Sequence, residues 1–197
     1  GAIRWTWSEY ATRVRAAAAG LAGLGLGRGD TIACWLTNRP EFHVADSAAM
    51  LLGATSFSVY GTFTVEQAEH VIGDAGSRIL VTEPAFLERA LTLRESGANA
   101  LEHVVLVEGE HESALTWDEL LACAPTEFDV DAAAAAAQPD DLITLIYTSG
   151  TTGPPKGVQL THANVCAQIE TTRARLSVAE GLRAISYLPM AHVAERL

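Results

Sequence analysis

The chain has 197 residues, 49% of them apolar, which is enough to fill the core of one large domain or of a pair of small domains. Its formal net charge of −11 argues against a nucleic-acid groove, because such a groove needs a basic surface. No stretch of about 18 uninterrupted apolar residues occurs, and no basic-then-apolar leader precedes a small-residue cleavage site, so we expect neither a membrane-spanning helix nor a signal peptide.

Three cysteines, Cys34, Cys123 and Cys166, are scattered along the chain. Their spacing matches neither a disulfide framework nor a metal site, which favours reduced, buried thiols. We therefore expect a cytoplasmic protein.

Helix-type and strand-type patterns alternate along the sequence. Helical spacing of apolar residues predicts helices at 8–25, 39–54, 64–76, 84–96, 116–124 and 162–176. Short apolar runs predict strands at 30–36, 55–60, 78–83, 103–109, 141–147 and 182–188. This alternation predicts an α/β fold in which a mostly parallel sheet has helices on both faces.

Local signals indicate where several elements begin and end. Ser8 is expected to cap the first helix, and Pro40 suits the first turn of the second. Thr64 and Gln67 form a capping box before the third helix. The glycines of residues 25–29 lack the spacing of a dinucleotide-binding fingerprint, so we interpret them as the turn that ends the first helix.

Residues 129–140 are compositionally biased, with six alanines between flanking Asp and Pro residues. The alanines could extend a helix, but their neighbours favour a surface connection.

The most informative stretch is YTSGTTGPPKGV, residues 147–158, which lies between the strand ending near Tyr147 and the helix expected to start near Thr161. Its glycines allow the backbone to turn successive N–H groups inward, and such groups form an anion-binding concavity. Together with the hydroxyls and the ammonium group of Lys156, they are suited to hold a polyphosphate. The expected ligands are Thr148, Ser149, Gly150, Thr151, Thr152, Gly153 and Lys156. The alternative is an ordinary surface loop, since these residue types are common in loops.

This loop does not match the Walker pattern of P-loop kinases and GTPases. Lys156 follows two prolines and precedes Gly157, so no Ser or Thr comes next to bind magnesium. A nucleotide-hydrolysing enzyme of that class is therefore disfavoured.

The stretch YTSGTTGPPKGVQLTHANV, residues 147–165, resembles the phosphate-loop signature of adenylate-forming enzymes, which include acyl-CoA synthetases, luciferases and peptide-synthetase adenylation domains. A second stretch, YLPMAHVAER at 187–196, looks like the next signature of the long-chain fatty acyl-CoA synthetase branch. Segments at 6–30, 38–54 and 59–67 also resemble that branch, so the resemblance covers almost the whole chain. Gly61 is a small departure, because many relatives have proline there.

The resemblance implies a two-step reaction that uses ATP, Mg²⁺ and coenzyme A. A fatty acid carboxylate attacks the α-phosphate of ATP and releases pyrophosphate, and the thiol of coenzyme A then displaces AMP from the acyl-adenylate. The resemblance further implies that Lys156 and Thr152 stabilise the departing pyrophosphate and that Thr148 approaches the metal ion. It places His192 beside the acyl and adenylate groups.

Several polar residues also have a structural interpretation. His192 could be a hydrogen-bonded structural histidine, and Glu195 and Arg196 are assigned to an ion pair or to a helix start. His162 and Asn164 are expected to cap the helix after the loop. Structural or exposed roles are assigned to the remaining histidines, His43, His70, His103 and His111.

The resemblance implies that residues 1–197 are part of an amino-terminal AMP-binding domain, with the rest of that domain and a small carboxy-terminal domain outside this sequence. We therefore expect the complete protein to be an AMP-forming long-chain fatty acid–CoA ligase, and residues 1–197 alone to be inactive. One alternative is a truncated module that binds a nucleotide or a partner protein without turnover. Within the enzyme class, a short-chain or aryl-acid ligase is the alternative. The acyl chain length, the oligomeric state and peripheral membrane contact stay open.

Overall fold

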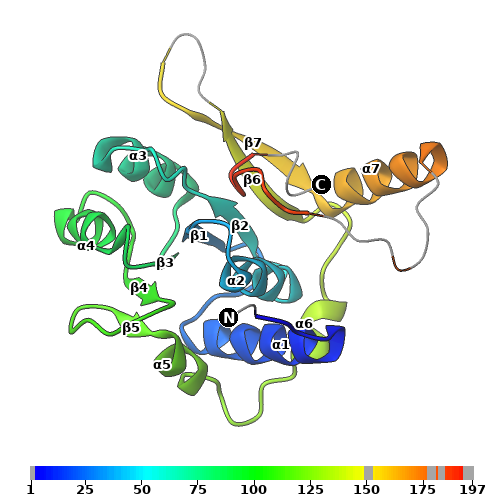
Figure 1. The fold of residues 1–197 in the computed structure, drawn as a ribbon, viewed down its shortest axis with the longest axis horizontal. Coiled ribbons are helices and arrows are strands. Elements are labelled where there is room, and N and C mark those ends of the chain that lie inside the picture. The colour runs from blue at the N-terminus through cyan, green and yellow to red at the C-terminus, as the bar shows by residue number, and fades with distance from the viewer. Residues whose placement is uncertain (1–2, 149–152, 177–180, 182–184, 193–197) are drawn as a thin grey trace.

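A seven-stranded sheet with the strand order β5-β4-β3-β1-β2-β6-β7 organises the molecule (Figure 1). The computed structural model describes residues 3–148, 153–176, 181 and 185–192. Neighbouring strands are parallel except for β6 and β7, which form an antiparallel pair. The strands are β1 (Thr31–Trp35), β2 (Thr55–Ser58), β3 (Ile79–Thr82), β4 (His103–Leu106), β5 (Leu115–Thr116), β6 (Leu142–Thr148) and β7 (Lys156–Thr161).

Helices cover both faces of this sheet (Figure 1). They are α1 (Trp7–Gly23), α2 (Pro40–Leu51), α3 (Val65–Ala75), α4 (Leu87–Ser96), α5 (Trp117–Ala122), α6 (Val130–Ala135) and α7 (His162–Arg175). Successive side chains of a strand point to opposite faces, so β1 serves two cores. Ile32 and Cys34 pack with α1 and α2, whereas Ala33 and Trp35 pack with α3 and α4. The predicted α/β fold with a mostly parallel sheet is thereby confirmed.

The predicted helix starts at Pro40 and Thr64 are confirmed, and the start of the first helix is corrected. Pro40 opens α2, and Thr64 caps α3 in a capping box with Gln67. The cap of α1 is Thr6, not Ser8, because Glu9 stands three residues after Thr6 and its carboxylate accepts a hydrogen bond from the Thr6 backbone N–H.

The turn predicted at residues 25–29 is confirmed, since α1 ends at Gly23 and both Gly25 and Gly29 have positive φ. Cys34 is buried as expected, but Cys166 is exposed, which corrects the prediction of buried thiols.

Residues 129–140 include a short helix, α6, that has no buried residue, because Asp129 caps the alanine run through a hydrogen bond from the Ala132 N–H. Two further predictions are wrong. Residues 185–188, the described part of the strand predicted at 182–188, form no strand. The glycine- and threonine-rich loop does not lead directly into a helix, because strand β7 intervenes and makes the loop the end of a hairpin.

None of the helices in the described part of the chain combines the length and the apolar character that crossing a membrane requires.

Candidate functional site

The β6–β7 hairpin presents the predicted phosphate loop at the carboxyl end of β6. Thr148 and Lys156 are cross-strand partners at the mouth of the loop, and directly opposed residues of an antiparallel pair project from the same face. Both residues are exposed, and Lys156 forms no ion pair with any described residue. The structure therefore places Thr148 and Lys156 opposite each other beside the loop.

The loop itself is described in part. Gly153 is exposed and has a φ of +134°, a backbone conformation that favours glycine, and a Cβ at this position would meet nothing within 4 Å. Ser149, Gly150, Thr151 and Thr152 lie outside the described residues.

Tyr147 fixes the register of the hairpin. Its ring is 2% exposed, packs 5.5 Å from the ring of Phe57, and donates its hydroxyl proton to Asp74 Oδ2 over 2.8 Å. Burial and the neighbouring Asp74 carboxylate raise the pKa of Tyr147 above its usual range. Gly157 lies opposite, and a Cβ on it would come within 3.1 Å of the tyrosine Cζ, so only glycine fits without displacing the ring.

The other side of the loop is also attached to α3. The Nε2 atom of His70 lies 2.9 Å from the carbonyl oxygen of Pro155, the residue before Lys156. Because a carbonyl can only accept, His70 is the donor of this hydrogen bond.

The second signature segment crosses the carboxyl ends of β1 and β2. Asn38, just beyond β1, donates from Nδ2 to the carbonyl oxygen of Leu188 over 2.6 Å. Ser58, the last residue of β2, donates from Oγ to the carbonyl oxygen of Met190 over 3.1 Å. Since β2 is parallel to its neighbour β6, the segment and the loop of the hairpin lie at the same end of the sheet, where the parallel strands have their carboxyl ends.

His192 lies on this segment, in a turn in which its backbone N–H bonds to the Pro189 carbonyl over 2.8 Å. His192 is therefore at a turn and not at the predicted strand end, and it is exposed. Asn164 completes a capping box with Thr161 at the start of α7, as predicted, whereas His162 is the first helical residue and not the cap. Glu195 and Arg196 lie outside the described residues.

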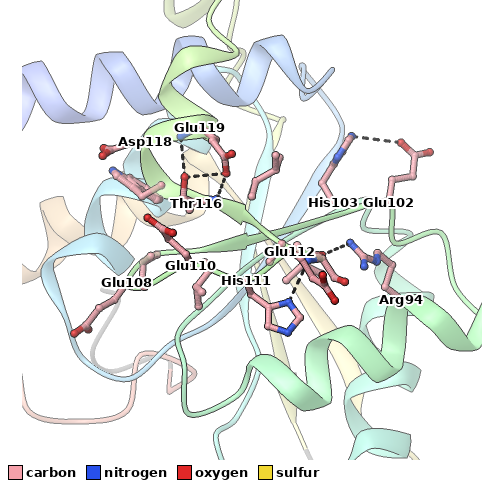
Figure 2. A pocket seen from close by; sticks show the side chains of 18 residues that line it. Arg94, Glu102, His103, Glu108, Glu110, His111, Glu112, Thr116, Asp118 and Glu119 are labelled. Atoms are coloured by element: carbon pink, nitrogen blue, oxygen red, sulfur yellow. Dashed lines mark hydrogen bonds and ion pairs between the residues drawn. The ribbon is translucent and has the colours of Figure 1, made fainter.

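A surface depression of about 1150 Å³ lies toward the other side of the sheet, around β4, β5 and α5 (Figure 2). It is lined by many carboxylates, and several of its polar groups bond to one another. Thr116 pairs with Glu119, and Arg94 donates to the carbonyl oxygen of Ser113. A depression of this size with an acidic lining is unsuited to phosphates, so chemistry places the candidate site at the hairpin instead.

No group of three or more His, Cys, Asp or Glu side chains in the described residues could hold a metal ion. At the hairpin, Thr148 would supply one hydroxyl oxygen, whereas protein-bound Mg²⁺ is usually held by one or two carboxylates together with substrate phosphates. The described side chains therefore do not form a magnesium site by themselves.

Comparison with known proteins identifies the family. The AMP-binding enzyme family matches residues 1–197, so the chain belongs to this family. It is 34% identical to a long-chain-fatty-acid–CoA ligase of Mycobacterium bovis over 97% of this chain and 33% identical to 4-coumarate–CoA ligase 3 of Oryza sativa subsp. japonica over 96% of it. An uncharacterised protein of Mycobacterium tuberculosis is 46% identical over 104 residues, which are 53% of this chain and 57% of that protein.

Solved structures agree on the fold. The o-succinylbenzoate–CoA synthetase of Bacillus subtilis, solved with an acyl-adenylate intermediate, is 29% identical, with a TM-score of 0.77 over 97% of this chain and 35% of that chain. A long-chain-fatty-acid–CoA ligase structure from Rhodopseudomonas palustris, named as putative, gives a TM-score of 0.84 over 98% of this chain and 47% of that chain at 22% identity. The chain spans 32–33% of the length of the two curated ligases.

Sequence reasoning found the loop and the second segment but missed the residues that hold them. Ser58, His70 and Asp74 lie in ordinary helix and strand patterns, and Asn38 lies in a short connection. Their partners are 73 to 150 residues away. Gly157 resembles a loop glycine in the sequence, but it lies in β7, where its missing side chain leaves room for the ring of Tyr147.

Proposed function

We propose that the complete protein is an ATP-dependent, AMP-forming ligase that joins a long-chain fatty acid to coenzyme A. The observation that carries this proposal is the exposed Lys156 beside Thr148 at the mouth of the glycine- and threonine-rich hairpin. A compact cation and a hydroxyl-bearing residue stand opposite each other there, and both are groups suited to a polyphosphate. The fatty acid as substrate is supported by the ligase relative from Mycobacterium bovis and by the segment at 187–196.

In the first step, a carboxylate oxygen of the acid forms a bond to the α-phosphorus of ATP, and the bond from that phosphorus to the bridging oxygen breaks. Pyrophosphate leaves with the electron pair. Lys156 and Thr152 would stabilise its growing charge, and Thr148, Ser149, Gly150, Thr151 and Gly153 would hold the phosphates. In the second step, the coenzyme A sulfur attacks the acyl carbon, AMP leaves, and the thiol proton passes to solvent.

The remaining groups have simpler assignments. His192 would contact the acyl-adenylate from the segment held by Asn38 and Ser58. Mg²⁺ would neutralise phosphate charge, with Thr148 as the proposed protein ligand, but the described residues do not support a step that depends on the metal.

We place the reaction in the cytoplasm.

A panel of acids tests the substrate assignment. We would measure AMP release by the complete protein with ATP, coenzyme A and either acetate, a medium-chain acid, a palmitate-like acid or an aromatic acid. The long-chain acid should give the highest kcat/KM. A higher kcat/KM for acetate or for an aromatic acid would contradict the long-chain assignment. Preference for an aromatic acid would favour a substrate like the one in the name of the 4-coumarate–CoA ligase relative.

Lys156 also offers a direct test of phosphate binding, because it is the only lysine in the sequence. In the complete protein, an amine-reactive label should modify Lys156, and saturating ATP should protect it, as measured by mass spectrometry of the peptide that contains Lys156. Equal labelling of Lys156 with and without ATP would contradict the phosphate role, whichever acid is the substrate.

A second candidate function is a module that binds a nucleotide or a partner without turnover. The uncharacterised relative from Mycobacterium tuberculosis favours it, since 104 matched residues make up 57% of that protein and it is therefore much shorter than the ligases. ATP protection of Lys156 without AMP formation by the complete protein would support this candidate over the enzyme.

A further inference from the structure

Two residues on one turn of α3 attach both strands of the hairpin at the base of the loop. Tyr147, the last residue but one of β6, donates to Asp74, and Pro155, directly before β7, accepts from His70. His70 and Asp74 are four residues apart, and residues at this spacing lie on the same face of a helix. The two attachments therefore approach the hairpin from one side.

The attachment points stand next to the groups that would meet the phosphates. Pro155 precedes Lys156 directly, and Tyr147 precedes Thr148, the cross-strand partner of Lys156. Tyr147 is held in place by Phe57 and by Gly157 as well as by Asp74. Because β7 is the edge strand and pairs only with β6, the bond from His70 gives its start a second attachment.

We propose that His70 and Asp74 are positioning residues that set the place of Lys156 and Thr148 relative to the phosphates of bound ATP. This inference rests on the proposed function. Neither residue touches the nucleotide, and both act through the backbone carbonyl of Pro155 and the hydroxyl of Tyr147. A donor held at a fixed place near developing charge is effective because it needs no reorganisation during the reaction.

The test combines backbone exchange with kinetics in the complete protein. In His70→Ala and Asp74→Ala, hydrogen–deuterium exchange of the amides in residues 156–158 should become at least tenfold faster. The KM for ATP should rise about fivefold or more, while the KM for the acid changes less than twofold. His70→Gln, whose amide can donate, and Asp74→Asn, whose amide oxygen can accept, should recover most of both effects. His103→Ala, which removes a partly exposed histidine at the opposite edge of the sheet, serves as the matched control.

The possible results separate the two proposals. Unchanged exchange in both alanine variants would overturn the positioning role, and so would faster exchange with an unchanged KM for ATP. A proportional rise of both KM values, or a failure of the conservative variants to recover, would indicate general destabilisation and would also overturn it. If the wild-type protein forms no AMP, the proposed function fails. The positioning role is then decided by two other measurements. Amide exchange of residues 156–158 should still become faster in the alanine variants, and the protection of Lys156 by ATP against labelling should be at least fivefold weaker in them.

Discussion

At the scale of single residues, Lys156 is the group on which the proposed chemistry depends most. It is exposed and pairs with no carboxylate among the described residues, so its removal should leave the fold intact. Lys156→Ala should cost roughly 2–4 kcal/mol of transition-state stabilisation, the usual effect of losing one preorganised group near developing charge.

The rate of pyrophosphate release by the folded Lys156→Ala variant measures this loss. Thr152→Ala should lose a similar amount of transition-state stabilisation. Arg15→Ala is the control for removing a positive charge, since Arg15 is half-exposed on α1 and pairs with Asp131. Wild-type rates in both loop variants would rule out their phosphate role.

Asp141 makes the clearest pH-dependent contribution to stability. Arg28 donates to both of its carboxylate oxygens over 2.7 and 2.8 Å, and the Gln138 N–H donates as well. These bonds lower the pKa of Asp141 from 3.8 to about 2, with the Arg28 hydrogen bond as the main cause. The stabilisation is therefore complete above pH 3.8 and is lost as the pH falls toward about 2.

Thermal unfolding between pH 7 and pH 2 checks this contribution. Asp141→Asn should unfold at a lower temperature than wild type at pH 7, and the two midpoints should converge as the pH falls through this window. Asp131→Asn, which removes one partner of an exposed ion pair, should show less convergence. A constant difference between wild type and Asp141→Asn across the range would contradict the assignment.

At the scale of elements, the parallel strands could be predicted and β7 could not. Strands β1, β2 and β3 are short apolar runs buried on both faces, which is the pattern typical of a parallel sheet. Strand β7 has no buried residue and includes Gly157, so its strand conformation depends on pairing with β6, not on its own residues. The loop of the candidate site could be predicted because its residues are contiguous, whereas its contacts with α3 depend on tertiary packing.

The sequence contains a local signal for the true start of α1, which is the pairing of Thr6 with Glu9. Thr6 and Ser8 are both good caps, but only Thr6 has a glutamate three residues later. Thr6→Ala should lower stability by about 1 kcal/mol, and Ser8→Ala should change it by less than about 0.5 kcal/mol. Urea unfolding of the two variants makes the comparison, and a larger loss from Ser8→Ala would contradict the observed cap.

At the scale of the whole molecule, residues 1–197 span 32–33% of the length of two curated ligases. We expect this chain to show little ligase turnover alone, because the phosphate loop supplies one part of a site. The chain also exposes apolar side chains on β7 and α7, and no residue of α7 is buried. Such a surface favours self-association.

Acyl-CoA formation and sedimentation of purified residues 1–197 test both expectations, with circular dichroism as the control for folding. A monodisperse monomer that turns over as fast as the complete protein would show that the catalytic site lies elsewhere.

The two bonds that hold the second signature segment join residues 150 and 132 positions apart in the sequence. The entropic cost of closing a loop rises with its length, so these contacts gain little until the sheet is in place. Synthesis also delivers Leu188 and Met190 long after Asn38 and Ser58. We therefore expect the segment that carries His192 to dock late, after the sheet has formed, so that the candidate site is completed last.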